Sequence, residues 1–186
     1  MKQYYLESER TALFLIDMQD KLYPAIADKE NLLKPLKILI NLAKIFDMPI
    51  YITEQYPRGL GETLPKIKTW IENGDIHYWE KTAFNAYLPE VEAQIKKDEV
   101  KSFIVTGIEA HICVLQTVRE LLNNQFNVFL VEDAVGSRDN QHKNNAVNLM
   151  REMGAVISNS ESIAYDLLKD SKHPDFKTIS NILKEN

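Results

Sequence analysis

The sequence has little cysteine and no long apolar run, and each shortage excludes a class of protein. The single cysteine, Cys113, cannot form an internal disulfide, which excludes a small secreted domain held together by disulfides. No apolar stretch approaches the roughly 20 residues needed to span a bilayer, so we expect no membrane association. The first residues also lack an apolar targeting segment. Together these features predict a cytoplasmic protein.

Concentrated positive charge is also missing from the sequence. The 22 Lys and Arg residues are outnumbered by 27 Asp and Glu residues, which gives a net charge of -5. The densest basic stretch, residues 96–101, is interrupted by Asp98 and Glu99. Because a nucleic-acid-binding face needs clustered basic side chains, the sequence predicts no nucleic-acid partner.

What is present is the composition of an ordinary globular domain. Of the 186 residues, 45% are hydrophobic and 26% are charged, which is typical of chains that bury one core. A chain of this length fits one domain comfortably and two only with difficulty. We therefore expect a single domain spanning residues 1–186, with no need for a disulfide or a structural metal.

Short apolar runs alternate with stretches of helical periodicity along the whole chain. Continuous apolar runs are typical of strands buried on both faces of a parallel sheet, and strands that alternate with helices indicate a doubly wound α/β fold. In such folds ligands bind at the carboxyl ends of the strands. Residues 54–71, which are rich in Gly and Pro, are predicted to form a long loop lining that edge. The predicted strands are 12–16, 49–53, 76–79, 103–106, 128–131 and 155–158, and the predicted helices are 32–43, 114–122, 146–153 and two beyond about 160, broken near Pro174.

The lone thiol stands in a position that suits a nucleophile. Cys113 follows the fourth predicted strand and Gly107, at the expected start of a helix, in an order that resembles a nucleophile elbow. The N–H groups of a helix N-terminus stabilise a thiolate. The alternative for a lone cysteine is a small buried hydrophobic residue with no chemical role.

Two charged residues also follow predicted strands. Asp17 ends the first apolar run, where a carboxylate can remove a thiol proton or hold a cation, or simply form a turn. Asp20 is the better candidate for capping a helix that begins nearby. Lys81 follows the third run, where an ammonium can stabilise a thiolate, or lie at the surface. Their placement at three strand ends predicts a shared site with Cys113.

Three ordered segments resemble the signatures of isochorismatase-like cysteine hydrolases. They are Phe14–Gln19 (FLIDMQ), Glu80–Phe84 (EKTAF) and Val105–Val114 (VTGIEAHICV). The resemblance extends over nearly the whole chain, and residues 53–61 (TEQYPRGLG), 132–138 and 173–177 are similar to the subgroup of isochorismatase domain-containing proteins.

The resemblance implies a three-layer sandwich around a six-stranded parallel sheet, and it assigns roles to residues. Asp17 would be the general base for the Cys113 thiol, and Lys81 would orient Asp17 and stabilise charge. The family carries a cis peptide at the position of Ile108–Glu109. This would direct the backbone N–H groups of Glu109 and Cys113 at a developing oxyanion. Relatives commonly form dimers or larger homo-oligomers, which we also expect here.

The implied activity is hydrolysis of a small carbonyl substrate through a Cys113 thioester, with an amide C–N bond favoured. Some relatives cleave a vinyl ether without needing the cysteine, so its presence favours acyl transfer. Ester or vinyl-ether hydrolysis remains an alternative. So does a binding or scaffold protein that keeps the triad without turnover, or a redox sensor, although the chain has no resolving cysteine.

The remaining site predictions concern the pocket and metal binding. We expect the pocket wall to include Gln55, Tyr56, Phe84 and Leu22 or Tyr23, a largely neutral aromatic lining that suits a small flat amide. Nicotinamidases of the superfamily bind a metal through histidines after the second strand, whereas residues 54–58 contain none. The sequence therefore predicts no metal and no cofactor.

Two residues between the motif glycine and the cysteine depart from many relatives. Glu109 and His111 stand where small or hydroxylated residues are common. Glu109 would brace the turn or face a neighbouring subunit, and His111 would be structural or exposed to solvent.

Overall fold

The computed structural model describes residues 4–185, so residues 1–3 and 186 of the expected domain lie outside the described part. Its centre is a six-stranded sheet in which every neighbouring pair is parallel, in the order β3-β2-β1-β4-β5-β6. This confirms the predicted doubly wound α/β fold. The strands are β1 (Thr11–Ile16), β2 (Ile50–Gln55), β3 (Ile76–Lys81), β4 (Ser102–Ile108), β5 (Asn127–Gly136) and β6 (Val156–Ser158).

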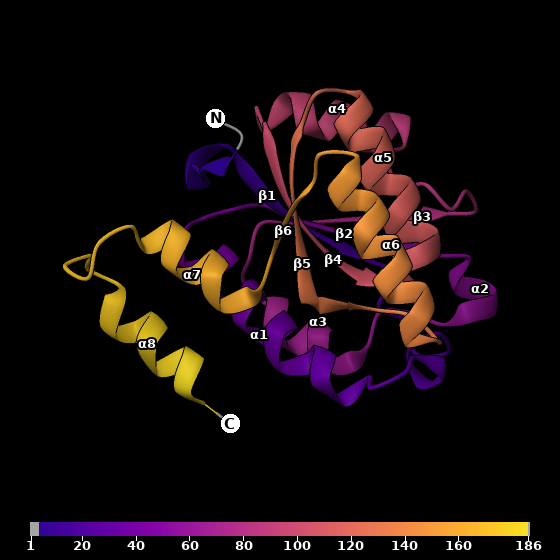
Figure 1. Cartoon of the computed structure of the whole chain (residues 1–186), viewed down its shortest axis with the longest axis horizontal. Helices are drawn as coiled ribbons and strands as arrows, with labels where there is room; N and C mark the ends of the chain where they lie inside the picture. Colours follow the sequence, from indigo (N-terminus) through magenta and orange to yellow (C-terminus); the bar gives the residue numbers. More distant parts are fainter. Residues whose placement is uncertain (1–3, 186) are drawn as a thin grey trace.

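Helices cover both faces of the sheet and complete the three layers (Figure 1). One face carries α1 (Glu30–Ile45), α3 (Pro65–Ile71), α7 (Ser160–Leu168) and α8 (Phe176–Lys184). The other face carries α4 (Pro89–Lys97), α5 (Leu115–Asn123) and α6 (Asn140–Glu152). Within residues 4–185, no helix combines the length and apolar character needed to cross a membrane.

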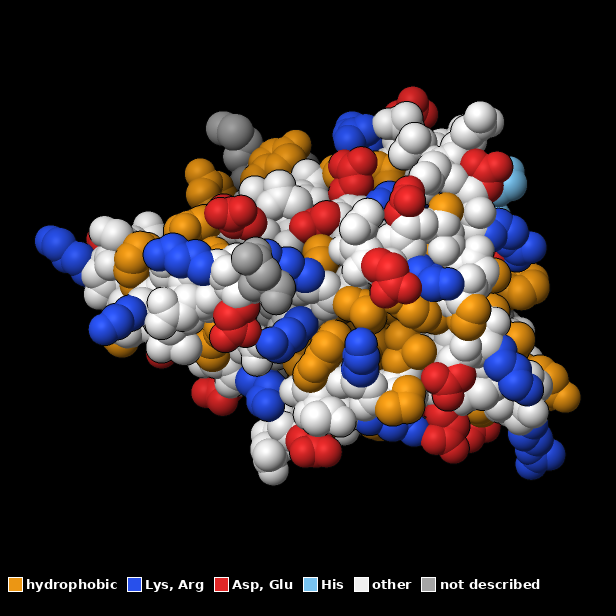
Figure 2. Space-filling model, turned by 90° about the horizontal axis from the view of Figure 1, so that it is seen from below, with side chains coloured by type: hydrophobic (Ala, Val, Ile, Leu, Met, Phe, Trp, Pro, Cys, Tyr) orange, Lys and Arg blue, Asp and Glu red, His pale blue; other side chains and the backbone are white. Residues whose placement is uncertain are grey.

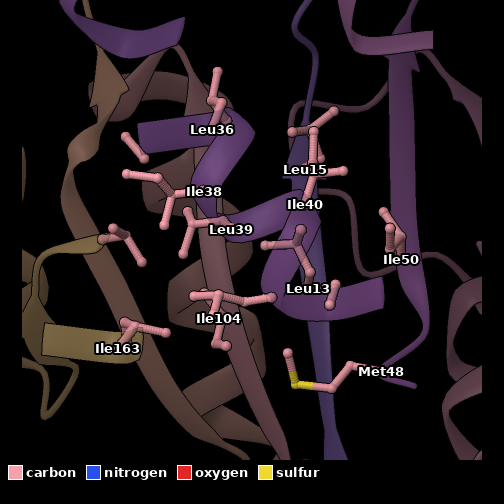
Figure 3. Packing of buried hydrophobic residues seen from close by; sticks show 14 of the residues in the cluster. Leu13, Leu15, Leu36, Ile38, Leu39, Ile40, Met48, Ile50, Ile104 and Ile163 are labelled. Carbon is pink, nitrogen blue, oxygen red and sulfur yellow. The ribbon is translucent and has the colours of Figure 1, made fainter. Parts of the chain in front are cut away.

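The first strand forms the middle of both hydrophobic cores. Its apolar side chains alternate between the two faces, and all of them are buried. Leu13 and Leu15 of β1 share one hydrophobic cluster with Leu36, Leu39 and Ile40 of α1 (Figure 3). Burying one such side chain contributes about 1.5–3 kcal/mol. This double-sided burial explains why β1 reads as one uninterrupted apolar run.

The strand order places three carboxyl ends at one edge of the sheet. It reverses between β1 and β4, which is the point where ligands bind in open α/β sheets. The pairing of Ile16 with both Thr53 and Gly107 brings the ends of β1, β2 and β4 together. Lys81, at the end of β3, is in register with Gln55 of β2. The edge predicted to hold the site therefore gathers the expected residues.

Gly107 is required where β4 passes β1. Its φ is +122°, and a Cβ at this position would overlap the backbone of Ile16. We expect Gly107→Ala to lower the free energy of unfolding by at least about 3 kcal/mol, because backbone strain costs about 1–3 kcal/mol and the overlap adds to it. Equilibrium unfolding in urea measures this loss.

Gly154→Ala provides a matched control for that experiment. Gly154 also has a positive φ, +106°, but no atom lies within 4 Å of the position of its Cβ. The control therefore carries the strain without the overlap and should cost less than the change at Gly107. Equal losses from the two substitutions would contradict the proposed close contact.

Two local predictions were wrong, and proline explains one of them. Residues 54–71 do not form a long loop, because β2 continues to Gln55 and is followed by α2 (Pro57–Leu60) and α3. Both helices have proline at their first turn, where its fixed φ favours a helix. Asp20 caps no helix, because the helical turn that follows is Tyr23–Ala25 and has Leu22 at its N-cap position. The two predicted C-terminal helices are confirmed as α7 and α8.

Candidate active site

Asp17 lies directly after β1 with its carboxylate fully buried. Its φ is +52°, and its backbone N–H donates to the Thr53 carbonyl oxygen at 3.1 Å. The carboxylate accepts from the Thr53 hydroxyl at 2.8 Å and from the Lys81 ammonium at 2.6 Å. The two carboxylate oxygens thus have different partners, which fixes the orientation of the group.

Lys81 forms a buried ion pair with Asp17, and both side chains are 0% exposed. The Lys81 Nζ donates to Asp17 Oδ2 and to Gln55 Oε1, each at 2.6 Å. It also lies 3.3 Å and 3.4 Å from the carbonyl oxygens of Ala83 and Phe84. A buried ammonium needs such oxygen partners to offset the loss of its hydration. Four oxygen atoms therefore surround the Lys81 Nζ and hold it beside Asp17.

Cys113 lies beside this pair rather than at the first residue of a helix. It belongs to a π-helical turn, η4 (Ala110–Val114), that precedes α5, and it is 6% exposed. Burial raises the pKa of the thiol to about 12, and the neighbouring Asp17 charge raises it further than Lys81 lowers it. The lowered pKa expected from a helix N-terminus is therefore not what the structure gives. At rest the sulfur keeps its proton.

The Asp17 carboxylate is made more basic than a surface carboxylate. Burial raises its pKa, and this effect outweighs the Lys81 charge and the hydrogen bonds from Lys81, Cys113 and Thr53 that lower it. A carboxylate with a raised pKa accepts a proton from a neighbouring thiol more readily. The site therefore combines a thiol of raised pKa with a carboxyl group that is more basic than one at the surface.

The turn before Cys113 contains the cis peptide bond Ile108–Glu109. The Glu109 carbonyl oxygen accepts from the N–H groups of Ile112 at 3.0 Å and Val114 at 3.2 Å. Within residues 4–185, no hydrogen bond uses the Glu109 N–H as its donor. The Glu109 N–H is therefore not engaged by another group of the described chain.

The Glu109 side chain braces the same turn, which was one of the two roles left open by the sequence. It accepts from the backbone N–H of Arg138 at 2.9 Å and from the Arg138 guanidinium. Burial alone would raise the Glu109 pKa, but these bonds from Arg138 outweigh it and lower the pKa. His111 contacts the Ser137 hydroxyl at 3.0 Å. The segment after β5 is therefore hydrogen-bonded to the turn that precedes Cys113.

Three of the four predicted pocket residues lie near Lys81. The Gln55 amide contacts its ammonium, and the Phe84 backbone lies beside it with the side chain 53% exposed. Tyr56 is 54% exposed and lines a cavity of about 380 Å³ together with Lys81, whereas Asp17 and Cys113 are not among the residues that line it. The cavity is lined by Tyr56, Pro57, Arg58, Glu80, Lys81 and Thr82.

Tyr23 lies elsewhere. Its hydroxyl donates to the Lys29 carbonyl oxygen at 3.1 Å, and the ring lines a separate cavity with Leu33 and Leu64. The structure therefore does not place Tyr23 with Gln55, Tyr56 and Phe84. Leu22 packs against the hydrophobic core instead.

Sequence reasoning missed two polar residues of the site, Thr53 and Gln19. Thr53 was visible as the polar end of an apolar run, and its register opposite Ile16 brings its hydroxyl to Asp17. Gln19 has no such signal, because its partners are backbone groups from a distant segment. In the described part of the chain, no three His, Cys, Asp or Glu side chains are arranged to hold a metal ion.

Comparison with known proteins supports the assignment that this geometry suggests. The isochorismatase domain model matches residues 11–162. The chain is 34% identical over 181 residues to isochorismatase domain-containing protein 2 of Xenopus laevis, covering 97% of this chain and 86% of the relative. It is 36% identical over 180 residues to isochorismatase family protein 1B of Dictyostelium discoideum, covering 95% and 87%.

A solved structure agrees over nearly the whole chain. The structure described as MAR1 ribonuclease from Caenorhabditis elegans is 36% identical, with a TM-score of 0.92, and the match covers 98% of this chain and 93% of that one. The fold, the extent of the domain match and the level of identity agree with one another. The chain therefore belongs to the isochorismatase family and is a hydrolase.

Proposed function

We propose that this hydrolase cleaves a small carbonyl substrate, preferentially at an amide C–N bond, through a thioester on Cys113. One observation carries the proposal: a fully buried Asp17–Lys81 ion pair lies beside a thiol that is itself almost fully buried. Buried groups with strongly shifted pKa values that face one another are typical of catalytic sites.

In the first half of the reaction the thiol becomes the nucleophile. The Asp17 carboxylate takes the proton of Cys113 while the sulfur attacks the carbonyl carbon. The carbonyl oxygen becomes an oxyanion that accepts from the Glu109 N–H and, as the family resemblance implies, the Cys113 N–H. The C–N bond then breaks as protonated Asp17 gives its proton to the leaving nitrogen. The products of this half are an amine and a thioester.

In the second half water replaces the amine. Asp17, again a carboxylate, takes a proton from water as the oxygen attacks the thioester carbon. The C–S bond breaks, the carboxylic acid leaves, and Asp17 returns its proton to the Cys113 sulfur. Lys81 stays charged throughout and holds Asp17 in place. Asp17 thus takes up and returns every proton in the reaction. Its raised pKa matters because it makes the carboxylate a better proton acceptor.

The shifted pKa values predict a one-sided pH profile. As pH falls through the raised pKa of Asp17, the base gains a proton and kcat/KM should fall. Because the thiol pKa is about 12, titration of Cys113 should cause no loss on the alkaline side up to about pH 10. The profile should be measured from pH 4 to 10 on a compound selected from a panel of small amides and p-nitrophenyl esters.

The panel also separates the bond types and tests the mechanism. Amides release ammonia or an amine, whereas esters and vinyl ethers do not.

A rate that increases steadily through pH 8–9 without a plateau would mean that hydroxide, not Asp17, deprotonates the thiol. That result would contradict Asp17 as the general base.

The ribonuclease description of the similar C. elegans protein defines a second candidate. A phosphodiester substrate would have to approach a chain with a net charge of -5, which opposes binding of a polyanion. On the face shown in Figure 2, basic side chains are interspersed with acidic ones. Incubation with single-stranded RNA, with a Cys113→Ser variant alongside, tests this activity. RNA cleavage that persists in the variant would come from another site or a contaminant.

Assembly into a dimer or larger homo-oligomer and a cytoplasmic location stay predictions from the family resemblance and the sequence. Size-exclusion chromatography with light scattering measures the first, and a mass equal to one chain of 21.5 kDa would contradict it.

A further inference from the structure

Gln55 occupies a fixed place against the catalytic ammonium. It ends β2 in register with Lys81 at the end of β3. Its Oε1 accepts from Lys81 Nζ at 2.6 Å, and its Nε2 donates to the Thr82 carbonyl oxygen at 2.8 Å. Because an ammonium can only donate, these two bonds permit one orientation of the amide. The oxygen and the nitrogen of the Gln55 amide are therefore both hydrogen-bonded to other groups of the protein.

A second glutamine holds the Gln55 backbone. The Gln19 side chain is 0% exposed. Its Oε1 accepts from the Gln55 N–H at 2.7 Å, and its Nε2 donates to the carbonyl oxygens of Gln55 at 3.0 Å and Gly61 at 2.6 Å. Gln19 lies only two residues after Asp17. These hydrogen bonds therefore link the segment that carries Asp17 to Gln55, the neutral partner of Lys81.

The charge of Gln55 matters as much as its position. Lys81 has two close partners at the same distance, the charged Asp17 and the neutral Gln55. The charged or titratable groups that act on Asp17 are Lys81 from β3 and Cys113 from the π-helical turn. A second carboxylate at position 55 would share the ammonium and favour protonation of Asp17. A neutral acceptor leaves the ammonium charge to Asp17.

We propose that Gln55 is a positioning residue that fixes the Lys81 ammonium against Asp17 and, being uncharged, keeps Asp17 ionised at working pH. This rests on the proposed function, in which Asp17 is the general base. It assigns Gln55 a role that acts through Lys81, in place of the substrate contact predicted from the sequence.

The test is the pH profile of Gln55→Glu. The acidic limb of kcat/KM should move to higher pH by about one unit or more, because two carboxylates would then compete for one ammonium. Gln141→Glu is the matched control: it makes the same substitution at an exposed position on α6 and should leave the limb unchanged. The pH dependence of Cys113 alkylation by iodoacetamide gives a second readout that does not need turnover.

The outcomes separate the inference from the proposed function. A wild-type profile without an acidic limb would count against Asp17 as base. If the wild type has an acidic limb and Gln55→Glu does not move it, the inference about Gln55 is overturned and the proposed function is not. If KM rises while the limb stays in place, Gln55 contacts the substrate, as the sequence analysis predicts. Circular dichroism and thermal unfolding verify that the variant folds. If it does not, Gln55→Met should lower kcat about tenfold or more with little change in KM, and an unchanged kcat would overturn the inference.

Discussion

Replacement of Cys113 by serine is expected to lower kcat/KM by at least about 10³-fold while leaving the fold intact, because removal of a catalytic nucleophile has effects of this size or larger. A serine hydroxyl is much less acidic than a thiol, so Asp17 would be too weak a base to activate it. Serine is close to cysteine in volume, and the site is 6% exposed, so packing changes little. The rate on a hydrolysed panel compound is the measurement, with circular dichroism as the check on folding.

Cys113→Ala serves as the control for residual chemistry by the hydroxyl group. Both variants should be inactive to a similar degree. If either retains more than about a tenth of the wild-type rate, the covalent mechanism is wrong, and water activated directly by Asp17 becomes the better explanation.

Replacement of Lys81 by methionine is expected to lower the free energy of unfolding by about 3–5 kcal/mol, because it leaves a buried carboxylate without its counter-charge. Both side chains of the pair are 0% exposed, so water cannot take over the lost interaction. Activity should be lost as well, since Asp17 would lose the ammonium that orients its carboxylate. Urea unfolding at neutral pH measures the stability change.

Two comparisons show whether burial is the cause. Lys68→Met removes the exposed partner of Glu62, where the side chains are 40% and 71% exposed, and should lower the stability much less than Lys81→Met does. The double variant Asp17→Asn, Lys81→Met removes both charges and should recover much of the lost stability while staying inactive. A Lys81→Met variant as stable as wild type would contradict a charged Asp17 in the folded protein.

The fold was predictable because its central strands, β1 and β4, are buried on both faces. Residues 12–16 of β1 are apolar without interruption, and such a run is compatible with the middle of a parallel sheet. The segment after β2 was not predictable, since Pro57 and Pro65 are equally compatible with a turn and with the first turn of a helix. Only packing decides between these possibilities.

The site was predictable to the level of strand ends but not of side-chain partners. Asp17 and Cys113 follow a strand and Lys81 ends one, so topology alone brings them to one edge. The hydrogen bond between Thr53 and Asp17 and the contact of Gln55 with Lys81 depend on register, which no periodicity in the sequence determines. The direction in which the pKa of the Cys113 thiol shifts depends on its burial and on its distance from charged groups. Both are determined by the tertiary structure.

Acylation of Cys113 by p-nitrophenyl acetate, compared between wild type and Asp17→Asn, tests the central claim most directly. Mass spectrometry with peptide mapping locates the acetyl group, and release of p-nitrophenol gives the rate. At pH 7 the wild type should be acylated on Cys113, and Asp17→Asn should react at least about 100-fold more slowly, because a general base contributes about 10²–10⁴-fold. An equally fast reaction in the variant, or an acetyl group on another residue, would contradict the account.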